Sequence, residues 1–380
     1  MLETKAVFGH SPRTVPQVSE VVPVKKLLLI GGGHAHIYIL KALQKENPGF
    51  EVTMISPSVH QYYSGMFSGY TEGIYAASDI TINLEELSIK AGASFIKGEV
   101  AEVDPVKKEV VLDECGYPFD LISFDVGSRV KQIPEPTEKV YSVKPNYVFT
   151  ENIDELKGSP APVVVGGGAA GVELALSMLA WRKNHQPHQR VTLIDSGNLL
   201  EEFGSKTSRR TEKLARRKGL SIIKGERVEE IGREFLQTDS GRHVHHSGVL
   251  WLSGAEAPSL FEQSNLKVDA KGFLFVDKYL RNPEYPFIYG AGDCVTLEEG
   301  GIPKNGVFAI KEAPVLWENL KRHTGSEELL AFQPPEKYMA ILSTGNRQGL
   351  LTYGNVMIHG KWCFTLKHFI DSRFMKKYNT

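Results

Sequence analysis

Two glycine-rich hexapeptides are the stretches of this chain whose residue types and spacing could do chemistry. Residues 166–171 have the full G-x-G-x-x-G spacing, and residues 31–36 share its first two glycines but carry His36 in place of the third. Glycines at this spacing allow a tight turn and let backbone N–H groups approach a diphosphate, which the N-terminus of the following helix also attracts. One imperfect copy would be weak evidence, but two copies in one chain indicate two dinucleotide-binding sites.

An acidic residue distinguishes the second site from the first. Asp195 ends the strand that follows the second turn, where a carboxylate accepts hydrogen bonds from both ribose hydroxyls and repels a 2′-phosphate. The next residues, 196–198, supply no arginine, so this site is predicted to prefer NAD(H) over NADP(H). Ser56 stands at the equivalent position of the first site, where its hydroxyl offers one hydrogen bond instead of two.

Apolar runs and a helical stretch flank each turn and would position it. Residues 26–30 and 51–55 are predicted strands around a helix over 34–44, and residues 163–194 repeat this order. The chain is therefore predicted to be α/β, with two Rossmann-like dinucleotide-binding domains and a small C-terminal α+β region. Further helices are predicted over 78–91, 207–218 and 307–320, strands over 94–103, 109–112, 119–125, 221–223, 228–231, 249–252, 272–276 and 287–289, a hairpin over 235–244, and two or three strands within 334–380.

Composition excludes several classes of protein. A content of 41% hydrophobic and 23% charged residues is that of an ordinary soluble globular chain, and a net charge of −1 gives no pull toward nucleic acid. No apolar run reaches the roughly 18 residues of a membrane-spanning helix. Residues 1–24 lack the apolar core of a signal peptide, so a cytoplasmic setting is expected.

The cysteines and histidines exclude two kinds of site. The three cysteines, Cys115, Cys294 and Cys363, lie far apart, and without a C-x-x-C motif no dithiol can relay electrons as it does in disulfide reductases. The run His243–His246 has no carboxylate or cysteine partner nearby in sequence, so no metal site is expected.

Several of these features recur together in one superfamily. The paired turns, the strands that end at Gly127 and Gly254, and the motif 290–293 resemble the two-dinucleotide-domain flavoproteins of the pyridine nucleotide-disulfide oxidoreductase superfamily, such as type II NADH:quinone oxidoreductases and apoptosis-inducing-factor-like proteins. The resemblance covers roughly residues 25–325. Segments 63–66, 303–309 and 370–375 look most like the NADH dehydrogenase-like oxidoreductase that is often fused to selenophosphate synthetase.

The resemblance implies FAD in the first unit and NADH in the second. It divides the chain into an N-terminal arm (1–24), a first part of the FAD domain (25–145), an NAD(H) domain (146–268), a second part of the FAD domain (269–330) and a C-terminal interface or membrane-associating region (331–380). The residues implied for FAD are Gly31, Gly33, His34, Ala35, Ser56, Ser64, Val100, Gly127, Gly292, Asp293, Val307 and Phe308. Those implied for NAD are Gly166, Gly168, Ala169, Ala170, Gly171, Asp195 and Gly254.

Three of the implied roles carry a chemical reason. Asp293 would accept a hydrogen bond from the ribityl chain of the flavin, and a helix that begins near Val307 would aim its N-terminus, roughly half a positive charge, at the edge of the anionic reduced flavin. Glu173 matches the glutamate that lies near the nicotinamide and is the candidate catalytic residue, although an acid in the first turn of a helix also stabilises the helix.

The implied activity is an FAD-dependent NADH oxidoreductase that passes electrons to a quinone or similar acceptor without a redox-active disulfide. Two alternatives remain open: an NADH-sensing flavoprotein scaffold, and a reductase linked to selenium or sulfur metabolism. The segment 361–378 interleaves basic and aromatic residues, including Lys367. It would lie on the inner face of the cell membrane, or pack on the FAD domain or on a second copy in a homodimer.

Overall fold

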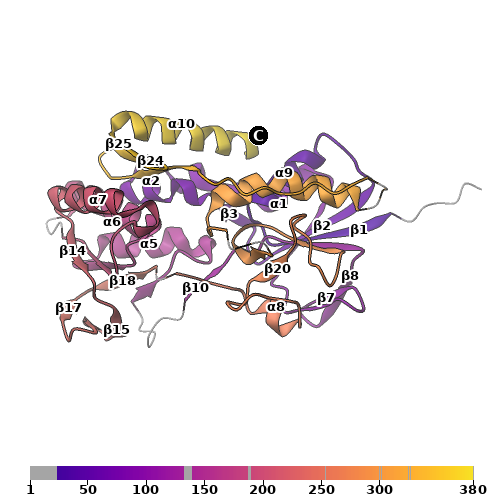
Figure 1. Cartoon of the computed structure of the whole chain (residues 1–380), viewed down its shortest axis with the longest axis horizontal. Helices are drawn as coiled ribbons and strands as arrows, with labels where there is room; N and C mark the ends of the chain where they lie inside the picture. Colours follow the sequence, from indigo (N-terminus) through magenta and orange to yellow (C-terminus); the bar gives the residue numbers. More distant parts are fainter. Residues whose placement is uncertain are drawn as a thin grey trace, which may run out of the picture.

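Two parallel sheets with helices on their faces, and an antiparallel sheet under the last helix, are the main layers of the described chain, and smaller sheets flank them (Figure 1). The computed structural model describes residues 24–131, 139–186, 190–252, 254–298, 300, 302–323, 325 and 327–379. The predicted N-terminal arm lies outside these residues except for Val24. Among the described helices, none has both the length and the apolar character needed to cross a membrane.

The first sheet has the strand order β21-β9-β1-β2-β5, all parallel. Its strands are Ile288–Gly290, Leu121–Phe124, Lys25–Ile30, Phe50–Ser56 and Ser94–Lys97 in that order. The apolar end of β1 is buried because helices cover both faces of a parallel sheet. Helix α1 (His34–Leu43) connects β1 to β2, and α9 (Gly306–Arg322) packs beside it. β21 comes from late in the chain, so two distant segments build this sheet.

The second sheet repeats the plan with the order β11-β18-β12-β13-β14. Its strands are Val140–Tyr141, Gly248–Trp251, Pro162–Val165, Thr192–Asp195 and Ser221–Lys224. The helices of this unit are α5 (Phe149–Gly158), α6 (Ala169–His185) and α7 (Ser205–Lys218). The fold class predicted from the sequence is confirmed.

Each parallel sheet is followed by a three-stranded antiparallel sheet. The first consists of β6 (Glu102–Asp104), β7 (Glu109–Leu112) and β8 (Cys115–Pro118). The second consists of β15 (Val228–Ile231), β16 (Phe235–Thr238) and β17 (His243–His245), which confirms the predicted hairpin. The remaining short elements are β3 (His60–Tyr62), η1 (Ser64–Met66), α2 (Phe67–Glu72), α3 (Ala77–Ile80), β4 (Thr81–Asn83), α4 (Leu84–Lys90), β10 (Arg129–Val130), η2 (Asn146–Val148), η3 (Glu201–Phe203), β19 (Ala255–Glu256), α8 (Leu260–Gln263), β20 (Leu274–Val276), η4 (Gly292–Cys294) and β22 (Val295–Leu297).

The C-terminal region is a three-stranded antiparallel sheet covered by one long helix. Strands β23 (Met339–Ser343), β24 (Gly349–Tyr353) and β25 (Val356–Gly360) lead into α10 (Lys361–Tyr378). β23 contacts α6 and α10 lies over β23 and β24, along the side of the molecule opposite the β15 and β17 hairpins (Figure 1). The sheet therefore joins the last helix to the second glycine-rich unit.

Two predicted elements are wrong. The predicted helix over 78–91 is broken by β4, because the β-branched residues Thr81 and Ile82 pair with β3 and Asn83 then caps α4. The predicted strand over 94–103 is two strands, β5 and β6, because the chain leaves the parallel sheet after Lys97 and joins the antiparallel one. The predicted helix over 307–320 is confirmed as α9.

Candidate active site

A single continuous cavity of about 2130 Å³ connects both glycine-rich turns with the C-terminal sheet and helix. A site for one small molecule usually occupies roughly 300–1,000 Å³, so this cavity has room for more than one ligand. Its walls come from the carboxyl ends of the parallel strands, where open α/β sheets bind ligands.

The first turn is pressed tightly against the end of β9. Gly31 has a φ of +90°, and a Cβ added there would lie 2.4 Å from the carbonyl oxygen of Asp125. The N–H of Gly33 donates to the same carbonyl at 3.1 Å. His36, at the position of the missing third glycine, is fully buried, and its ring bonds to the Gly31 carbonyl at 2.7 Å and to Ser123 at 2.9 Å. The departure from the glycine pattern is thus accommodated by hydrogen bonds.

Asp125 places a carboxyl group at the N-terminus of α1. Its Oδ2 accepts the N–H of Ala35 at 2.7 Å, and a Cβ added to Gly33 would meet the carboxyl group at 2.1 Å. Burial raises the pKa of Asp125 to about 7. The segment Phe124-Asp125-Val126-Gly127 therefore brings a titratable group to the helix end that a diphosphate needs.

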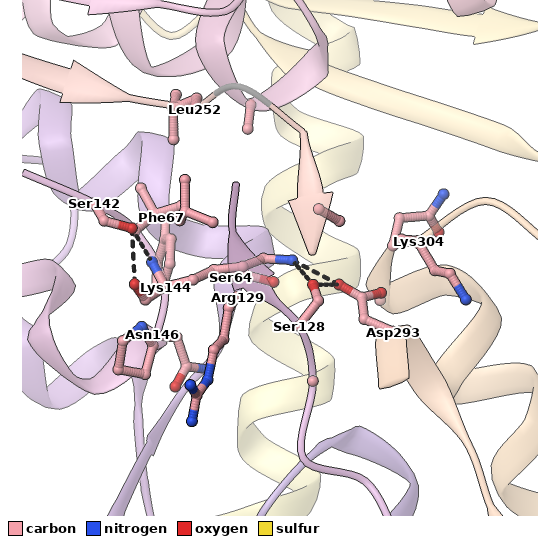
Figure 2. A pocket seen from close by; sticks show the side chains of 18 of the residues that line it. Ser64, Phe67, Ser128, Arg129, Ser142, Lys144, Asn146, Leu252, Asp293 and Lys304 are labelled. Atoms are coloured by element: carbon pink, nitrogen blue, oxygen red, sulfur yellow. Dashed lines mark hydrogen bonds and ion pairs between the residues drawn. The ribbon is translucent and has the colours of Figure 1, made fainter. Parts of the chain in front are cut away.

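A lysine between β11 and α5 reaches the first glycine-rich turn's side of the cavity. Lys144 Nζ lies 2.8 Å from Asp293 Oδ2 and also contacts the Ser128 hydroxyl, as Figure 2 shows. Both lysine and aspartate line the cavity. The sequence argument found Asp293 but missed Lys144 and Ser128, which carry no motif of their own. A flexible ammonium group here offers a counter-charge to a diphosphate.

The second turn is open toward the cavity. Gly166 has a φ of +117°, and a Cβ there would lie 2.7 Å from the Leu252 carbonyl, which fixes the tight turn. A Cβ on Gly168 would meet only Glu202 Oε1, at 3.9 Å, so ligand atoms can approach the backbone. One on Gly171 would lie 1.8 Å from the Gly166 carbonyl, so only glycine allows α6 to start this close to β12.

Two carboxylates surround the second turn. Asp195 accepts the Gly167 N–H at 2.5 Å and the Gly197 N–H at 2.8 Å, which holds it at the end of β13 beside the turn. Glu202 accepts the N–H of Ala169 at 3.2 Å at the N-terminus of α6. Both line the cavity. The position of Asp195 fits the predicted ribose contact, while the exposed Glu202 occupies an anion-binding helix end that the sequence did not predict.

Glu173 lies deeper in the cavity, in α6 just beyond the first turn of the helix. Its Oε1 accepts hydrogen bonds from the Ser68 hydroxyl at 2.8 Å and the Ser343 N–H at 2.7 Å, and it lies 3.9 Å from Lys367 Nζ. Burial raises the pKa of this carboxyl. Side chains or backbone of α2, β23 and α10 thus meet at Glu173. The resemblance to the family predicted this acid, but the sequence did not predict the residues that contact it.

The N-terminus of α9 also faces the cavity. Asn305 caps the helix by accepting the Val307 N–H at 3.1 Å, and Gly306 lies beside the ring of His34. Burial lowers the pKa of His34 to about 4, so its imidazole is neutral. Behind the helix start, buried Glu312 accepts the Gly292 N–H at 2.6 Å, and burial raises its pKa to about 8.

Most of the residues predicted for the two nucleotides border this cavity, and three do not. Ala35 is buried behind Asp125, Gly292 faces Glu312, and the ring of Phe308 packs in the core 5.5 Å from that of Tyr338. Those that border it are Gly31, Gly33, His34, Ser56, Ser64, Val100, Gly127, Asp293, Val307, Gly166, Gly168, Ala169, Ala170, Gly171, Glu173, Asp195 and Gly254.

Lys367 has a role that the sequence did not predict. It was one of the basic residues interleaved in the tail, and it is buried and points to Gly65, Asp371 and Glu173. The spacing of four between Lys367 and Asp371 was the available signal, because residues i and i+4 share one helix face. Within the described residues no group of three or more histidines, cysteines and acids is arranged to hold a metal.

Comparison with known sequences decides the family. The pattern of the pyridine nucleotide-disulphide oxidoreductases matches residues 25–317. The chain belongs to this family. It is therefore an FAD-dependent oxidoreductase that uses a pyridine nucleotide, as the sequence predicted. The two glycine-rich turns fit these two cofactors. A side chain at Gly31 or Gly166 would collide with a neighbouring backbone carbonyl, and both turns line the cavity.

Individual relatives are distant but cover nearly the whole chain. Mouse ferroptosis suppressor protein 1 is 26% identical over 88% of this chain and 90% of its own length. The type II NADH:quinone oxidoreductase of Staphylococcus saprophyticus is 23% identical over 93% of this chain and 96% of its own.

Solved structures share the fold. The sulfide:quinone oxidoreductase of Aquifex aeolicus has a TM-score of 0.79 at 20% identity, and it covers 93% of this chain and 91% of its own. NDH2 of Plasmodium falciparum in complex with NADH has a TM-score of 0.79 at 16% identity, with 94% of this chain and 99% of its own covered. The fold of these structures is therefore shared over more than nine-tenths of this chain.

Proposed function

We propose that this flavoenzyme transfers electrons from NADH to a quinone. The observation that carries the proposal is an apolar wall on the part of the cavity next to Glu173. Four consecutive residues of β23 (339–342) and Ile370 of α10 form this wall. Met339 and Ile370 are 42% and 40% exposed, whereas Leu342 is buried, so the wall includes both surface and interior residues. An apolar passage from the surface suits a ring with an aliphatic tail.

The relatives support this choice of acceptor. The staphylococcal protein is named as a type II NADH:quinone oxidoreductase, and the structure from Aquifex as a sulfide:quinone oxidoreductase. The reductant differs between them, while the quinone is common to both. Asp195 beside the second turn favours NADH as the reductant of this chain.

The residues of the chain can be given roles around the two cofactors. The first turn, Lys144 and Asp293 would hold FAD, and the second turn with Asp195 would hold NADH. When bound, FAD supplies the ability to accept a hydride and release electrons. The α9 N-terminus, capped by Asn305, provides a positive helix end where negative charge develops. The buried position of Glu173 places a titratable carboxyl beside the acceptor passage.

Contact with a membrane is part of the proposal, because quinones with long tails reside in lipid. Trp362 and Phe369 on the outer face of α10 are 51% and 61% exposed, and Lys361, Arg373 and Lys376 are exposed on the same helix. Aromatic and basic side chains together favour an anionic membrane surface. The apolar passage beside Ile370 would then open toward the lipid.

The test begins with the purified, flavin-loaded protein under anaerobic conditions. NADH should bleach the flavin absorption faster than NADPH at equal concentration, and adding a soluble quinone should restore the colour. A flavin that NADH leaves oxidised would show that the donor is wrong. A flavin that NADH bleaches but that no quinone reoxidises would show that the acceptor is wrong.

A further inference from the structure

Helix α7 concentrates positive charge on one face. It carries seven basic residues and one acid, although the whole chain has a net charge of −1. Its buried residues are small, namely Thr207, Ser208, Thr211 and Ala215. After Ser205, every exposed residue of the helix is basic: Lys206, Arg209, Arg210, Lys213, Arg216 and Arg217. Because an α-helix has about 3.6 residues per turn, these residues lie on the side opposite the buried one and form a single surface, the α7 basic face.

The charges of the α7 basic face are poorly compensated within the chain. Arg216 pairs with Glu212 at 3.0 Å, but Glu212 also pairs with Lys224 at 2.7 Å. The other five cations of the face form no ion pair within the part of the chain that the structure describes. Three pairs of cations on the face are four residues apart, where like charges repel, and the first turn has Lys206 but no acid at the positive helix end. A helix that keeps this unfavourable arrangement indicates an anionic partner.

The C-terminal end of α7 adjoins the sheet that carries α10. Lys218 Nζ donates to Gln348 Oε1 at 2.7 Å and to the Gly345 carbonyl at 3.3 Å, both in the turn between β23 and β24. Burial, and then the charge of Lys218, lower the pKa of His359, which lies two residues before the start of α10. Figure 1 shows α7 and the start of α10 on the same side of the molecule, with β15 and β17 on the other. One partner with an extended surface can therefore contact both helices.

We propose that the α7 basic face binds the anionic headgroups of a phospholipid bilayer, as a second point of attachment beside α10. The proposal rests on the membrane contact in the proposed function and adds a surface on the second glycine-rich unit. Exposed Trp362 and Phe369 of α10 can enter the lipid. None of the apolar side chains of α7, which the structure describes completely, is exposed, so this helix stays at the level of the headgroups. Two separate attachments restrict the tilt of the molecule on the surface, which one helix alone does not.

Nucleic acid, the other common partner of a basic helix, fits these observations less well. Proteins that bind single strands add aromatic rings on which the bases stack, and α7 has no aromatic residue. Domains that bind duplexes are usually strongly basic as a whole, whereas this chain has a net charge of −1. The neighbouring α10 exposes aromatic side chains beside basic ones, which suits the boundary between headgroups and acyl chains.

Sedimentation with vesicles that contain phosphatidylglycerol tests the α7 basic face directly. The α7 variant replaces three of its exposed cations by glutamine, Arg209→Gln, Arg210→Gln and Lys213→Gln. Each basic residue near an anionic surface strengthens binding roughly fivefold, so the affinity of this variant should fall on the order of a hundredfold. The control variant has the same net charge but changes exposed residues outside α7 and α10, Lys90→Gln, Arg233→Gln and Lys271→Gln, and it should bind like the wild type. Vesicles of phosphatidylcholine alone should bind the wild type far more weakly.

Equal affinity of the α7 and control variants for the anionic vesicles would overturn the proposal, and so would equal affinity of the wild type for anionic and neutral vesicles. Binding to a DNA duplex that is tighter than binding to the vesicles, and that the α7 variant loses, would assign the face to nucleic acid instead. The proposed function fails differently, because reduction of a soluble quinone by NADH needs no vesicle. Both variants should keep the wild-type rate in that assay, which shows that they are folded. A wild type that reduces no quinone refutes the acceptor assignment, while sedimentation still reports on α7.

Discussion

At the scale of single residues, Asp125 makes the strongest electrostatic prediction. Its pKa is raised from 3.8 to about 7, so between these values the folded chain holds a proton that the unfolded chain has released. The folded state is stabilised by this bound proton, so the free energy of unfolding decreases as the pH rises from about 4 to about 7. Asp125→Asn has no such proton, and its stability advantage over the wild type should grow by a few kcal/mol across this window.

Urea unfolding of the cofactor-free protein at a series of pH values measures this difference. Asp113→Asn, in an exposed turn, serves as the matched control for replacing an aspartate by asparagine. A constant difference for Asp125→Asn would mean that the carboxyl at the start of α1 is ionised throughout. In that case the first cradle would carry a full negative charge toward the diphosphate of FAD.

Residue types at the glycine turns were predictable because backbone sterics leave few choices there. Gly31 and Gly166 have positive φ values and a neighbouring carbonyl within 3 Å of an added Cβ. Only glycine satisfies both conditions, so the sequence motif alone was enough to predict these turns. Lys144 and Asp371 were not predictable as site residues. Each reaches the cavity through a tertiary arrangement that joins segments more than 140 residues apart, which no local pattern records.

At the scale of elements, the start of α9 depends on one cap. Asn305 accepts the Val307 N–H at 3.1 Å, and loss of such an N-cap costs about 1 kcal/mol. Asn305→Ala should therefore lower the thermal unfolding temperature and weaken retention of FAD, because the positive helix end borders the cavity. Asn305→Ser, which keeps an oxygen acceptor, should behave nearly like the wild type. If serine fails as badly as alanine, the side chain is needed for its contact with Tyr338 instead of for capping.

Element boundaries were predictable where a turn signal was strong and failed where distant pairing decided the conformation. The helix α9 and the hairpin of β16 and β17 were predicted within a few residues of their ends. The segment 78–91 has helical composition, yet pairing of Thr81–Asn83 with β3 interrupts it. Basic and apolar residues alternate in the segment 361–378, and this was visible in the sequence. The pattern alone could not show that the helix face with Lys367 is buried.

At the scale of the whole molecule, α10 and the sheet of β15, β16 and β17 lie on opposite sides (Figure 1). This separation makes a controlled test of membrane contact feasible. Trp362 on α10 and Phe235 on β16 are about equally exposed, at 51% and 49%, so replacing either by serine removes similar apolar surface without disturbing the core. Only the first lies on the helix that also carries Ile370, a residue of the proposed acceptor passage.

Sedimentation with anionic phospholipid vesicles should distinguish these faces. Burying an aromatic side chain in lipid contributes roughly 2 kcal/mol, so Trp362→Ser should weaken binding at least tenfold and Trp362→Ser with Phe369→Ser further still. Phe235→Ser should bind like the wild type. Raising the salt concentration should weaken binding of all of them, because the basic residues of α10 act through screened charge. Equal binding by the α10 and β16 variants would place the membrane contact elsewhere, and the quinone would then have to reach the cavity from water.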